Sequence, residues 1–364
     1  MGYRFNKKRA LLFTISAIFS VAGVVVFLPD RSSEGNYEVQ VRKKESPEET
    51  LEQNPASVVE EALPPNPFIL SEDQVDRVRR VQAERLALLA SECSKEPKPN
   101  RAVYERSFAI LARRFEIVDK YRVSNCMVLK AGFTAWNALL AYVLGRQDLI
   151  DGHQTYMMSR ILKGSAAKFA SVNSSPDYMK FVVAREPLAR LLSAYRDRID
   201  AAHETGAANR FVPLILTFTR GMGYKPTHAN GTRIMPSFEE FLRYIVSVAP
   251  EAHDPHWRPI ALQCGACFVN YTLIAHAETL NEDLGYILRE TGIEKDADYT
   301  ILLYNSHKGR GNTSDLLENY YSAVSPKLMQ NILAVYRKDF TMFGYDPSDF
   351  LKKLYPDGSV AWNP

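Results

Sequence analysis

The stretch Phe181-Val-Val-Ala-Arg-Glu-Pro-Leu-Ala-Arg-Leu-Leu-Ser-Ala-Tyr195 carries the pattern that decides the fold. Residues 181–184 form a short apolar run typical of a buried strand, and from Glu186 onward the leucines recur at helical spacing. The stretch therefore predicts a strand, a short loop and a helix that buries one leucine-rich face.

Two more segments repeat this order of a strand followed by a helix. Cys126-Met-Val-Leu129 precedes a helical pattern from about Thr134, and Thr272-Leu-Ile-Ala-His276 precedes one that runs through Leu280 to Arg289. Such alternation forms βαβ crossovers, which make the strands parallel and cover the sheet with helices. We therefore expect an α/β fold, a parallel sheet flanked by helices, over residues 70–364. Further helix starts are predicted by Ser71-Glu-Asp-Gln74, Ser237-x-x-Glu240 and Ser325-Pro326.

The loop between residues 184 and 187 brings together groups that bind phosphate. In an open parallel sheet, ligands collect at the carboxyl ends of strands, where helix N-termini offer unpaired N–H groups and a positive dipole. Arg185 stands at the predicted strand end with a bidentate guanidinium, and Ser193 adds a hydroxyl two helical turns later. Taken alone, Arg185 is better explained by a salt bridge to Glu186, and Ser193 by the packing of a small residue.

The earlier segment Leu129-Lys-Ala-Gly-Phe-Thr-Ala-Trp136 has similar chemistry. Lys130 supplies a charge, Gly132 lets the backbone approach a ligand, and Thr134 supplies a hydroxyl on the same short turn. This turn can hold a phosphate group. The Walker pattern G-x-x-x-x-G-K-[ST] does not occur in the chain, so nucleoside triphosphate hydrolysis is not supported.

Several further motifs follow in a fixed order. Arg185 to Asp197 fit the pattern R-E-P-x-x-R-L-x-S-A-Y-R-D, and after them come His256-Trp-Arg-Pro259, Cys264-x-x-Cys267, Asn270-Tyr271, Glu278-Thr-Leu280 and Tyr336-x-x-Asp-Phe-x-x-Phe-Gly-Tyr345. In these motifs the sequence resembles the carbohydrate sulfotransferases that modify chondroitin, dermatan and terminal N-acetylgalactosamine at the 4-position. It also resembles their relative that sulfates glucuronic acid in a glycoprotein epitope. The resemblance covers most of residues 70–364.

This resemblance implies a P-loop-like sulfotransferase fold with 3′-phosphoadenosine-5′-phosphosulfate (PAPS) as the sulfuryl donor. It implies a glycan as acceptor, with the 4-position of N-acetylgalactosamine in chondroitin-type chains as the first choice. Arg185 and Ser193 would hold the 3′-phosphate. The 5′-phosphosulfate would lie on the first loop, formed by Lys130, Ala131, Gly132, Phe133, Thr134 and Ala135.

The first loop departs from the family pattern P-K-x-x-C-T-N-W-K-R. Lys130, Thr134 and Trp136 are kept. Five positions differ, because Pro, Cys, Asn, Lys and Arg are replaced by Leu129, Phe133, Ala135, Asn137 and Ala138. These departures leave open an alternative hypothesis, a non-catalytic relative that binds glycans or organises partners.

Sulfuryl transfer requires an in-line nucleophile, a base for its proton and a cation on the departing phosphate. Lys130 is the predicted cation. His256 is the predicted general base, because a histidine of near-neutral pKa in the polar loop His253-Asp-Pro-His-Trp257 suits that role. The alternative for His256 is a surface histidine, or one that stacks beside Trp257. This scheme needs no metal.

A type II glycosyltransferase is a further alternative, and it would need an Asp-x-Asp motif for a metal-bound nucleotide sugar. Asp296-Ala-Asp298 has this pattern, but it stands among charged residues after a predicted helix and is better explained as a solvated loop. His307, Lys308 and Arg310 form a basic loop that could contact a polyanionic acceptor or the donor phosphate. Such loops are more often only solvated.

The N-terminal region predicts a membrane anchor. Residues 11–28 form an uncharged apolar run, which as a helix spans about 27 Å. A cleaved signal peptide is the alternative, although its apolar region is usually only about 7 to 15 residues long. Basic residues before the run predict a cytosolic tail at 1–10 and a lumenal remainder. Residues 29–69 are acidic and contain prolines, so we expect a flexible stem and a Golgi-type, single-pass type II topology.

Two further patterns agree with a lumenal domain. The four cysteines predict two disulfides in one of three pairings, although Cys264-x-x-Cys267 could also indicate a zinc or redox site. N-x-S/T triplets that could accept glycans begin at Asn173, Asn230, Asn270 and Asn312. The cysteines are Cys93, Cys126, Cys264 and Cys267.

The charge of the chain argues against nucleic acid as a partner. The whole chain carries a formal net charge of +3, and the stem alone has nine acidic against four basic residues between positions 30 and 61. The part from 66 to 364 is consequently only mildly basic. A strong positive potential must therefore be confined to a local pocket.

Overall fold

The structure is a computed structural model that describes residues 66–98, 101–150, 154–200, 206–225, 227–228, 231–302 and 316–364. The predicted tail at 1–10, the apolar run at 11–28 and nearly all of the predicted stem lie outside the described residues. So do Asn230, Asn312 and the basic loop at 307–310. Among the helices that the structure describes, none has the length and apolar character to cross a membrane.

The centre of the fold is a four-stranded sheet of order β1-β2-β3-β4. Pairing of β2 with β3 and of β3 with β4 is parallel, whereas β1 and β2 are antiparallel, so the prediction of a wholly parallel sheet was wrong at one edge. The reason is the short 3₁₀ helix η2 (Asp119–Tyr121) and the left-handed Arg122 after it, which turn the chain straight back without a helical crossover. The strands are β1 (Phe115–Val118), β2 (Val123–Cys126), β3 (Met179–Ala184) and β4 (Leu273–His276).

Two of the three predicted strand–helix units are confirmed. β3 leads into α6 (Pro187–Arg198), and β4 leads into α10 (Leu280–Thr291) through the short η6 (Ala277–Thr279). The first unit was misplaced, because β2 ends at Cys126 and the apolar residues that follow it are buried in a loop rather than a strand. Its helix α3 (Phe133–Val143) begins one residue before the predicted start.

The predicted helix starts are confirmed by their caps. Ser71 and Gln74 form a capping box for α1 (Glu72–Ser94), and Ser237 and Glu240 form one for α8 (Phe238–Ser247). Ser325 caps α13 (Pro326–Phe343), which has its proline in the first turn. In each case a Ser hydroxyl accepts a hydrogen bond from a backbone N–H that would otherwise be unpaired. The sequence alone therefore locates the N-terminal ends of these helices.

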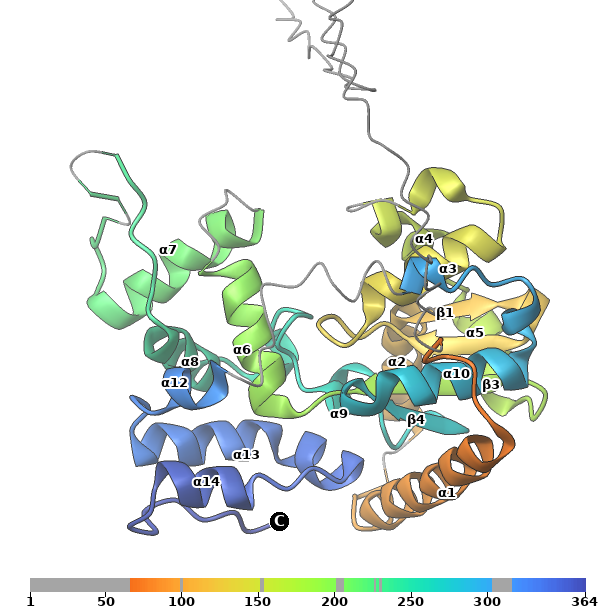
Figure 1. Cartoon of the computed structure of the whole chain (residues 1–364). Helices are drawn as coiled ribbons and strands as arrows, with labels where there is room; N and C mark the ends of the chain where they lie inside the picture. The colour runs from red at the N-terminus through yellow and green to blue at the C-terminus, as the bar shows by residue number, and fades with distance from the viewer. Residues whose placement is uncertain are drawn as a thin grey trace, which may run out of the picture. The chain divides into compact units, whose positions relative to one another are not determined.

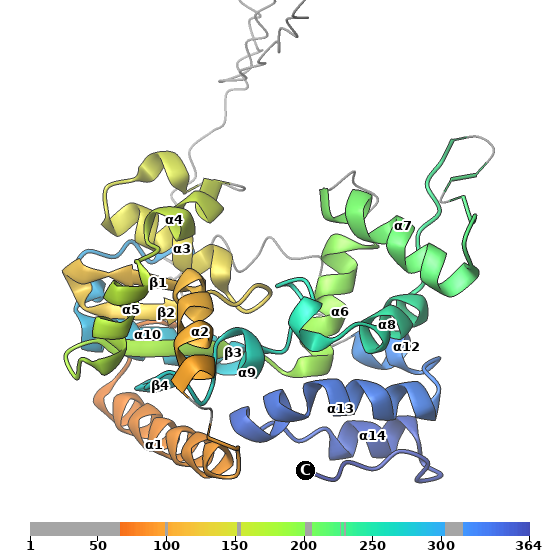
Figure 2. The same cartoon turned by 180° about the vertical axis from the view of Figure 1, so that it is seen from behind.

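Helices cover both faces of the sheet (Figures 1 and 2). Phe181 and Leu273 point to the face where α3 and α10 pack, while their neighbours Val182 and Ile274 point to the face covered by α2 (Arg101–Leu111) and α5 (Ala166–Ser174). This period of two is what a buried central strand requires. Smaller elements around the sheet are η1 (Ala112–Arg114), η3 (Gln147–Leu149), α4 (Thr155–Ile161), α9 (Ile260–Gln263) and η7 (Ile293–Lys295).

A second hydrophobic core lies beside the sheet in a helical region (Figure 1). Trp257 and Tyr336 are fully buried there, so the loop that carries His256 is anchored in this core. The region consists of α6, α8 and α13 together with η5 (Pro250–Ala252), α7 (Gly206–Arg220), α12 (Leu317–Tyr321) and α14 (Ser348–Leu354).

The cysteines form two disulfides, Cys93–Cys267 and Cys126–Cys264. The first joins the end of α1 to the chain after α9, and the second joins the end of β2 to the end of α9. Because the two cysteines of the C-x-x-C motif belong to different bridges, the motif is neither a dithiol redox pair nor a zinc site.

The folded domain begins earlier than the predicted boundary at residue 70. Phe68 is 5% exposed and packs in the core with Trp136 and Leu284. A Cβ on Gly285 would lie 2.5 Å from the carbonyl oxygen of Phe68. A glycine at this position therefore lets the chain pass close over α10. Phe68 therefore belongs to the domain and not to the stem.

Candidate active site

A cavity of about 800 Å³ opens where the loops after β2 and β3 meet the loop before α9. It brings together every residue that the sequence predicted for donor binding or catalysis except Ala131, which is buried behind the loop. The predicted residues that line it are Lys130, Gly132, Phe133, Thr134, Ala135, Arg185, Ser193 and His256.

The first loop is shaped by two left-handed residues. Lys130 has φ 70° and Gly132 has φ 77°, so the chain bends sharply before α3 begins. A Cβ on Gly132 would lie 2.7 Å from Cδ2 of Leu280 and would occupy a left-handed backbone, so glycine is favoured here. No side chain caps α3, and its first-turn N–H groups at Phe133, Thr134 and Ala135 are free to bind an anion.

Lys130 belongs to an ion cluster inside the cavity. Its Nζ lies 3.2 Å from Oδ2 of Asp197, and Nε of Arg198 lies 3.1 Å from the same oxygen. Burial lowers the pKa of Lys130, and the charge of Asp197 opposes this shift. Burial alone would raise the pKa of Asp197, but the charges of Lys130 and Arg198 outweigh it and hold that pKa below its usual value. Asp197 therefore stays ionised and holds the lysine in place.

Arg185 links the two predicted phosphate-binding loops. Its Nη1 donates a hydrogen bond of 2.7 Å to the carbonyl of Lys130. Burial lowers its pKa, and the charge of Glu278 opposes the shift. From the sequence we considered a salt bridge between Arg185 and Glu186. In the structure the Glu186 carboxylate caps α6 instead, because it accepts a hydrogen bond from Ala189 N at 2.5 Å.

Arg190 supports the site from behind, and our sequence analysis gave it no role. It is 2% exposed and donates to three carbonyls, those of Leu129 at 3.2 Å, Arg258 at 2.8 Å and Pro255 at 3.0 Å. One guanidinium thus fixes the first loop and the His256 loop in relation to each other. The signal was in the sequence, since an arginine on the leucine-rich face of a helix must find several acceptors.

His256 lies in the cavity wall with one nitrogen fixed and the other unpaired. Nδ1 lies 2.5 Å from Oδ1 of Asp254, whereas Nε2 is buried and has no hydrogen-bond partner among the described residues. Burial lowers the pKa of His256, although Asp254 opposes this shift. A neutral imidazole that donates from Nδ1 presents its Nε2 lone pair as a base.

The alternatives for the histidines of this loop do not apply to His256. Its ring lies 6.5 Å from that of Trp257 at 41°, and Trp257 is buried in the helical core. His253 is the structural histidine of the pair, because its Nε2 lies 3.0 Å from the carbonyls of Ile245 and Val248. Asp254, which our sequence analysis left without a role, orients His256 and could have been suspected from the D-x-H spacing.

The cavity also collects charges from distant parts of the chain. Arg114 and Arg198 join Lys130 and Arg185, so four cations face two carboxylates, those of Asp197 and Asp254. This is the local positive potential that the mildly basic composition required. Arg114 and Arg198 could not be assigned from the sequence, because nothing in a single sequence shows that they converge.

The C-terminal segment Tyr336–Tyr345 supports the site and does not line it. Tyr345 OH donates to Glu278 Oε2 at 2.8 Å, and Glu278 Oε1 accepts from Glu186 N at 2.9 Å. Asp339 accepts from the N–H groups of Ile260 and Ala261, each at 2.7 Å, and so caps α9. The segment resembling the family's C-terminal motif therefore holds the start of α6 and α9 in position.

The predicted Asp-x-Asp pattern lies away from this cavity. Asp296 accepts from Tyr121 OH at 2.6 Å and Lys120 at 2.9 Å, and Asp298 accepts from Thr300, so the Asp-x-Asp pattern stabilises local structure.

Among the described N-x-S/T triplets, the structure does not support the predicted glycosylation site at Asn173. It is 3% exposed and its Oδ1 accepts from Asn270 N at 2.8 Å, so a glycan does not fit there. Asn270 is exposed, and it stays a predicted glycosylation site.

Comparisons with known proteins agree with this geometry. The model of a family described as "Sulfotransferase family" matches residues 113–346. Carbohydrate sulfotransferase 10 from Rattus norvegicus is 28% identical over 313 residues, which cover 80% of this chain and 83% of the relative. The protein of the same name from Xenopus laevis is 29% identical, over 74% of this chain and 77% of its own. Carbohydrate sulfotransferase 11 from Rattus norvegicus is 26% identical, over 65% and 68%. No solved structure matches.

One cavity thus contains a histidine and the two loops that carry the predicted anion-binding groups, an arrangement that suits group transfer from an anionic donor. The matched segment 113–346 contains the whole sheet and both loops, and the chain belongs to the sulfotransferase family. Within that family it is grouped with the carbohydrate sulfotransferases. This membership implies PAPS as the sulfate donor and a glycan as the acceptor.

Proposed function

We propose that this enzyme transfers the sulfuryl group of PAPS to the 4-hydroxyl of N-acetylgalactosamine in chondroitin-type chains. One observation carries the proposal: His256 lines the same cavity as both anion-binding loops, and its Nε2 has no hydrogen-bond partner among the described residues. A base and a donor site that share one cavity are what transfer to a hydroxyl requires. The 4-position itself rests on the motifs that resemble the family.

The residues of the cavity fit a donor with phosphate groups at both ends. The open N–H groups at the start of α3, together with Lys130, would hold the 5′-phosphosulfate. Arg185 and Ser193 would hold the 3′-phosphate, and the bond from Arg185 to the Lys130 carbonyl keeps the two subsites at a fixed separation. When bound, the donor supplies an activated sulfuryl group.

The chain's own residues would then divide the chemistry. His256 Nε2 takes the proton of the acceptor hydroxyl as that oxygen forms a bond to sulfur, and Asp254 stabilises the resulting imidazolium. The sulfur–oxygen bond to the 5′-phosphate breaks in the same step. Lys130 neutralises the charge that appears on the phosphate oxygen, while Asp197 keeps the ammonium within reach.

The altered first loop is compatible with this role. Asn137 and Ala138, which replace Lys and Arg of the family pattern, are fully buried in α3 and do not line the cavity. Only Leu129, Phe133 and Ala135 change its surface, and all of them leave the backbone N–H groups in place. These positions support retained donor binding over a non-catalytic role.

For its location we propose a Golgi membrane enzyme with a type II anchor at 11–28 and a lumenal domain. The charge asymmetry around that apolar run supports the orientation. The two disulfides support an oxidising compartment.

The test is a transfer assay with the purified full-length chain, radiolabelled PAPS and a panel of desulfated acceptors, followed by disaccharide analysis. We expect label at the 4-position of N-acetylgalactosamine in chondroitin. His256→Ala should lower turnover by about 10² to 10⁴-fold, with donor affinity by calorimetry unchanged. The exposed His228 gives the control variant His228→Ala.

Each part of the proposal has its own contradicting result. Label on another sugar or position would refute the acceptor assignment. Retained turnover in His256→Ala would remove this residue from the mechanism. Donor binding without transfer to any acceptor would favour the non-catalytic alternative.

A further inference from the structure

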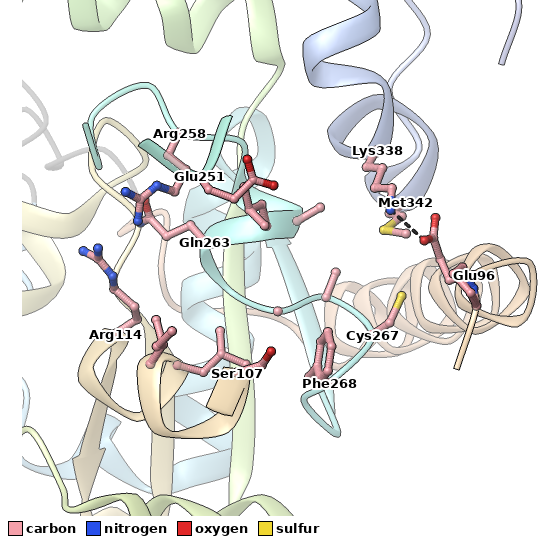
Figure 3. Close-up of a pocket in the computed structure, with 17 residues that line it drawn as sticks. Glu96, Ser107, Arg114, Glu251, Arg258, Gln263, Cys267, Phe268, Lys338 and Met342 are labelled. Carbon is pink, nitrogen blue, oxygen red and sulfur yellow. Dashed lines mark hydrogen bonds and ion pairs between the residues drawn. The ribbon is translucent and has the colours of Figure 1, made fainter. Parts of the chain in front are cut away.

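A second cavity, of about 490 Å³, adjoins the candidate active site (Figure 3). It lies between the end of α2, the chain around α9 and the C-terminal part of α13. Arg114 lines both cavities, so a ligand in the second would stand next to the place where transfer occurs.

Two arginines face each other at the end nearest the active site. The guanidinium groups of Arg114 and Arg258 lie on the same side of the cavity (Figure 3), and no ion pair to either is present within the described part of the chain. Burial, followed by the like charge of Arg114, lowers the pKa of Arg258. Two guanidinium groups without a carboxylate between them form a site for an anion.

The same end of the cavity holds a buried donor and a buried acceptor that are both unused. Nε of Arg258 has no hydrogen-bond partner in the described structure, although its Nη2 donates to the His253 carbonyl at 2.6 Å. Gln263 is 3% exposed, and its Nε2 donates to the Met127 carbonyl at 2.7 Å, which fixes the amide orientation. Its Oε1 is left buried without a partner. Buried polar groups are normally satisfied, so these two atoms indicate a missing ligand.

The remaining walls suit a sugar ring. Ile110 is 58% exposed and Leu262 is 40% exposed, and both line this cavity. An apolar surface beside polar groups matches the C–H face and the hydroxyl edge of a pyranose. The charges of Asp254 and Glu251 partly oppose the lowered pKa of Arg258, but the Glu251 carboxylate points away from the two arginines in Figure 3. Lys338 is paired with Glu96 at 2.6 Å.

We propose that this cavity binds a uronic acid residue of the acceptor glycan, next to the sugar that is sulfated. The carboxylate lies between Arg114 and Arg258, and a ring hydroxyl donates to Gln263 Oε1. The inference rests on the proposed function, because a polymer that alternates hexosamine and uronic acid places a carboxylate one sugar away from each acceptor hydroxyl. Arg114 and Arg258 are thus specificity-determining residues for an acidic chain.

The experiment compares unsulfated chondroitin with carboxyl-reduced chondroitin, in which each uronic acid is converted to a neutral sugar. The full-length enzyme should use chondroitin with a kcat/KM about tenfold higher, since a charged hydrogen-bonded pair contributes on that order. Arg114→Gln should bring the ratio of the two kcat/KM values close to one. Lys338→Gln, which removes a charge from the far end of the same cavity, should keep the original ratio.

Binding of the two polymers, measured by calorimetry without donor, separates this inference from the proposed transfer activity. Carboxylate-dependent binding that is lost in Arg114→Gln supports the subsite even if no sulfate is transferred. Equal affinity of the unaltered enzyme for both polymers, or an Arg114→Gln ratio that matches the unaltered enzyme, overturns the subsite and leaves the transfer activity standing.

Discussion

The loops after β2 and β3 begin at neighbouring parallel strands, yet they prepare their anion-binding groups in opposite ways. After β2 the chain makes a left-handed turn at Lys130 and Gly132, and the start of α3 has no side-chain cap. After β3 the Glu186 carboxylate caps α6. In the described part of the chain, the first loop therefore leads into a helix start without a side-chain cap, whereas the second loop leads into a capped one, and there we propose that the side chains of Arg185 and Ser193 bind the phosphate.

The difference predicts which substitutions each loop tolerates. A loop that binds through its backbone depends on its φ angles and on close packing, whereas a loop that binds through side chains depends on their chemistry. The following predictions test this contrast, beginning with the largest expected effect.

Gly132→Ala should lower donor affinity and turnover by at least about 100-fold, because a displacement of about 1 Å at a reacting centre has effects of that size. The new Cβ would meet the Leu280 side chain at 2.7 Å and would occupy a left-handed backbone. Donor binding by calorimetry and the transfer assay measure the loss. Gly145→Ala is the matched control, since Gly145 has φ 72° but open space around it. Equal losses in both variants would mean that backbone strain alone is responsible.

Much of this contrast could be anticipated from the sequence. The strand–helix units at β3 and β4 follow from apolar runs before helical patterns, and the capped helices follow from Ser-x-x-Gln, Ser-x-x-Glu and Ser-Pro. The resemblance placed Lys130, Arg185 and Ser193 in one site, and all three line the same cavity. These features are local, or are carried by short motifs.

The misplaced features depend on contacts between distant residues. The apolar run at residues 126–129 suggested a strand, but burial beneath neighbouring elements gives the same pattern without strand pairing, and β2 ends at Cys126. Arg114 and Arg198 reach the cavity only because the fold brings their segments together, and the sequence does not show which three carbonyls Arg190 contacts. Periodicity carries no information about such convergence.

The cap of the second loop should make stability depend on pH. Burial raises the pKa of Glu186 to about 7, well above its ordinary 4.5. The folded state therefore binds this proton more tightly than the unfolded state, so the contribution to stability is full below pH 4.5 and is lost as pH rises through about 7. We expect the free energy of unfolding to fall by about 3 kcal/mol because of this group as the pH rises from below 4.5 to above 7.

Denaturant unfolding of the full-length chain at a series of pH values measures this effect. Glu186→Gln removes the titrating group but keeps an oxygen that can accept from Ala189 N. The difference between the two proteins should therefore change with pH from about 4.5 through the folded pKa of about 7, and it should become constant only well above that pKa. A difference that does not vary with pH would show that folding leaves the pKa of Glu186 at its ordinary value.

Ser193→Ala should give the smallest effect, a loss of donor affinity of about fivefold without a change in stability. A single neutral hydroxyl contributes about 1 kcal/mol, and Ser193 lines the cavity on a helix that is held in place by other residues. Ser174→Ala is the control, because Ser174 is an exposed helical serine that bonds only the carbonyl of Ala170. Calorimetry with adenosine 3′,5′-bisphosphate isolates the 3′-phosphate from the reacting sulfate. If affinity for adenosine 5′-phosphosulfate, which lacks the 3′-phosphate, falls equally in Ser193→Ala, then Ser193 contacts the other end of the donor and the assignment of the two loops must be exchanged.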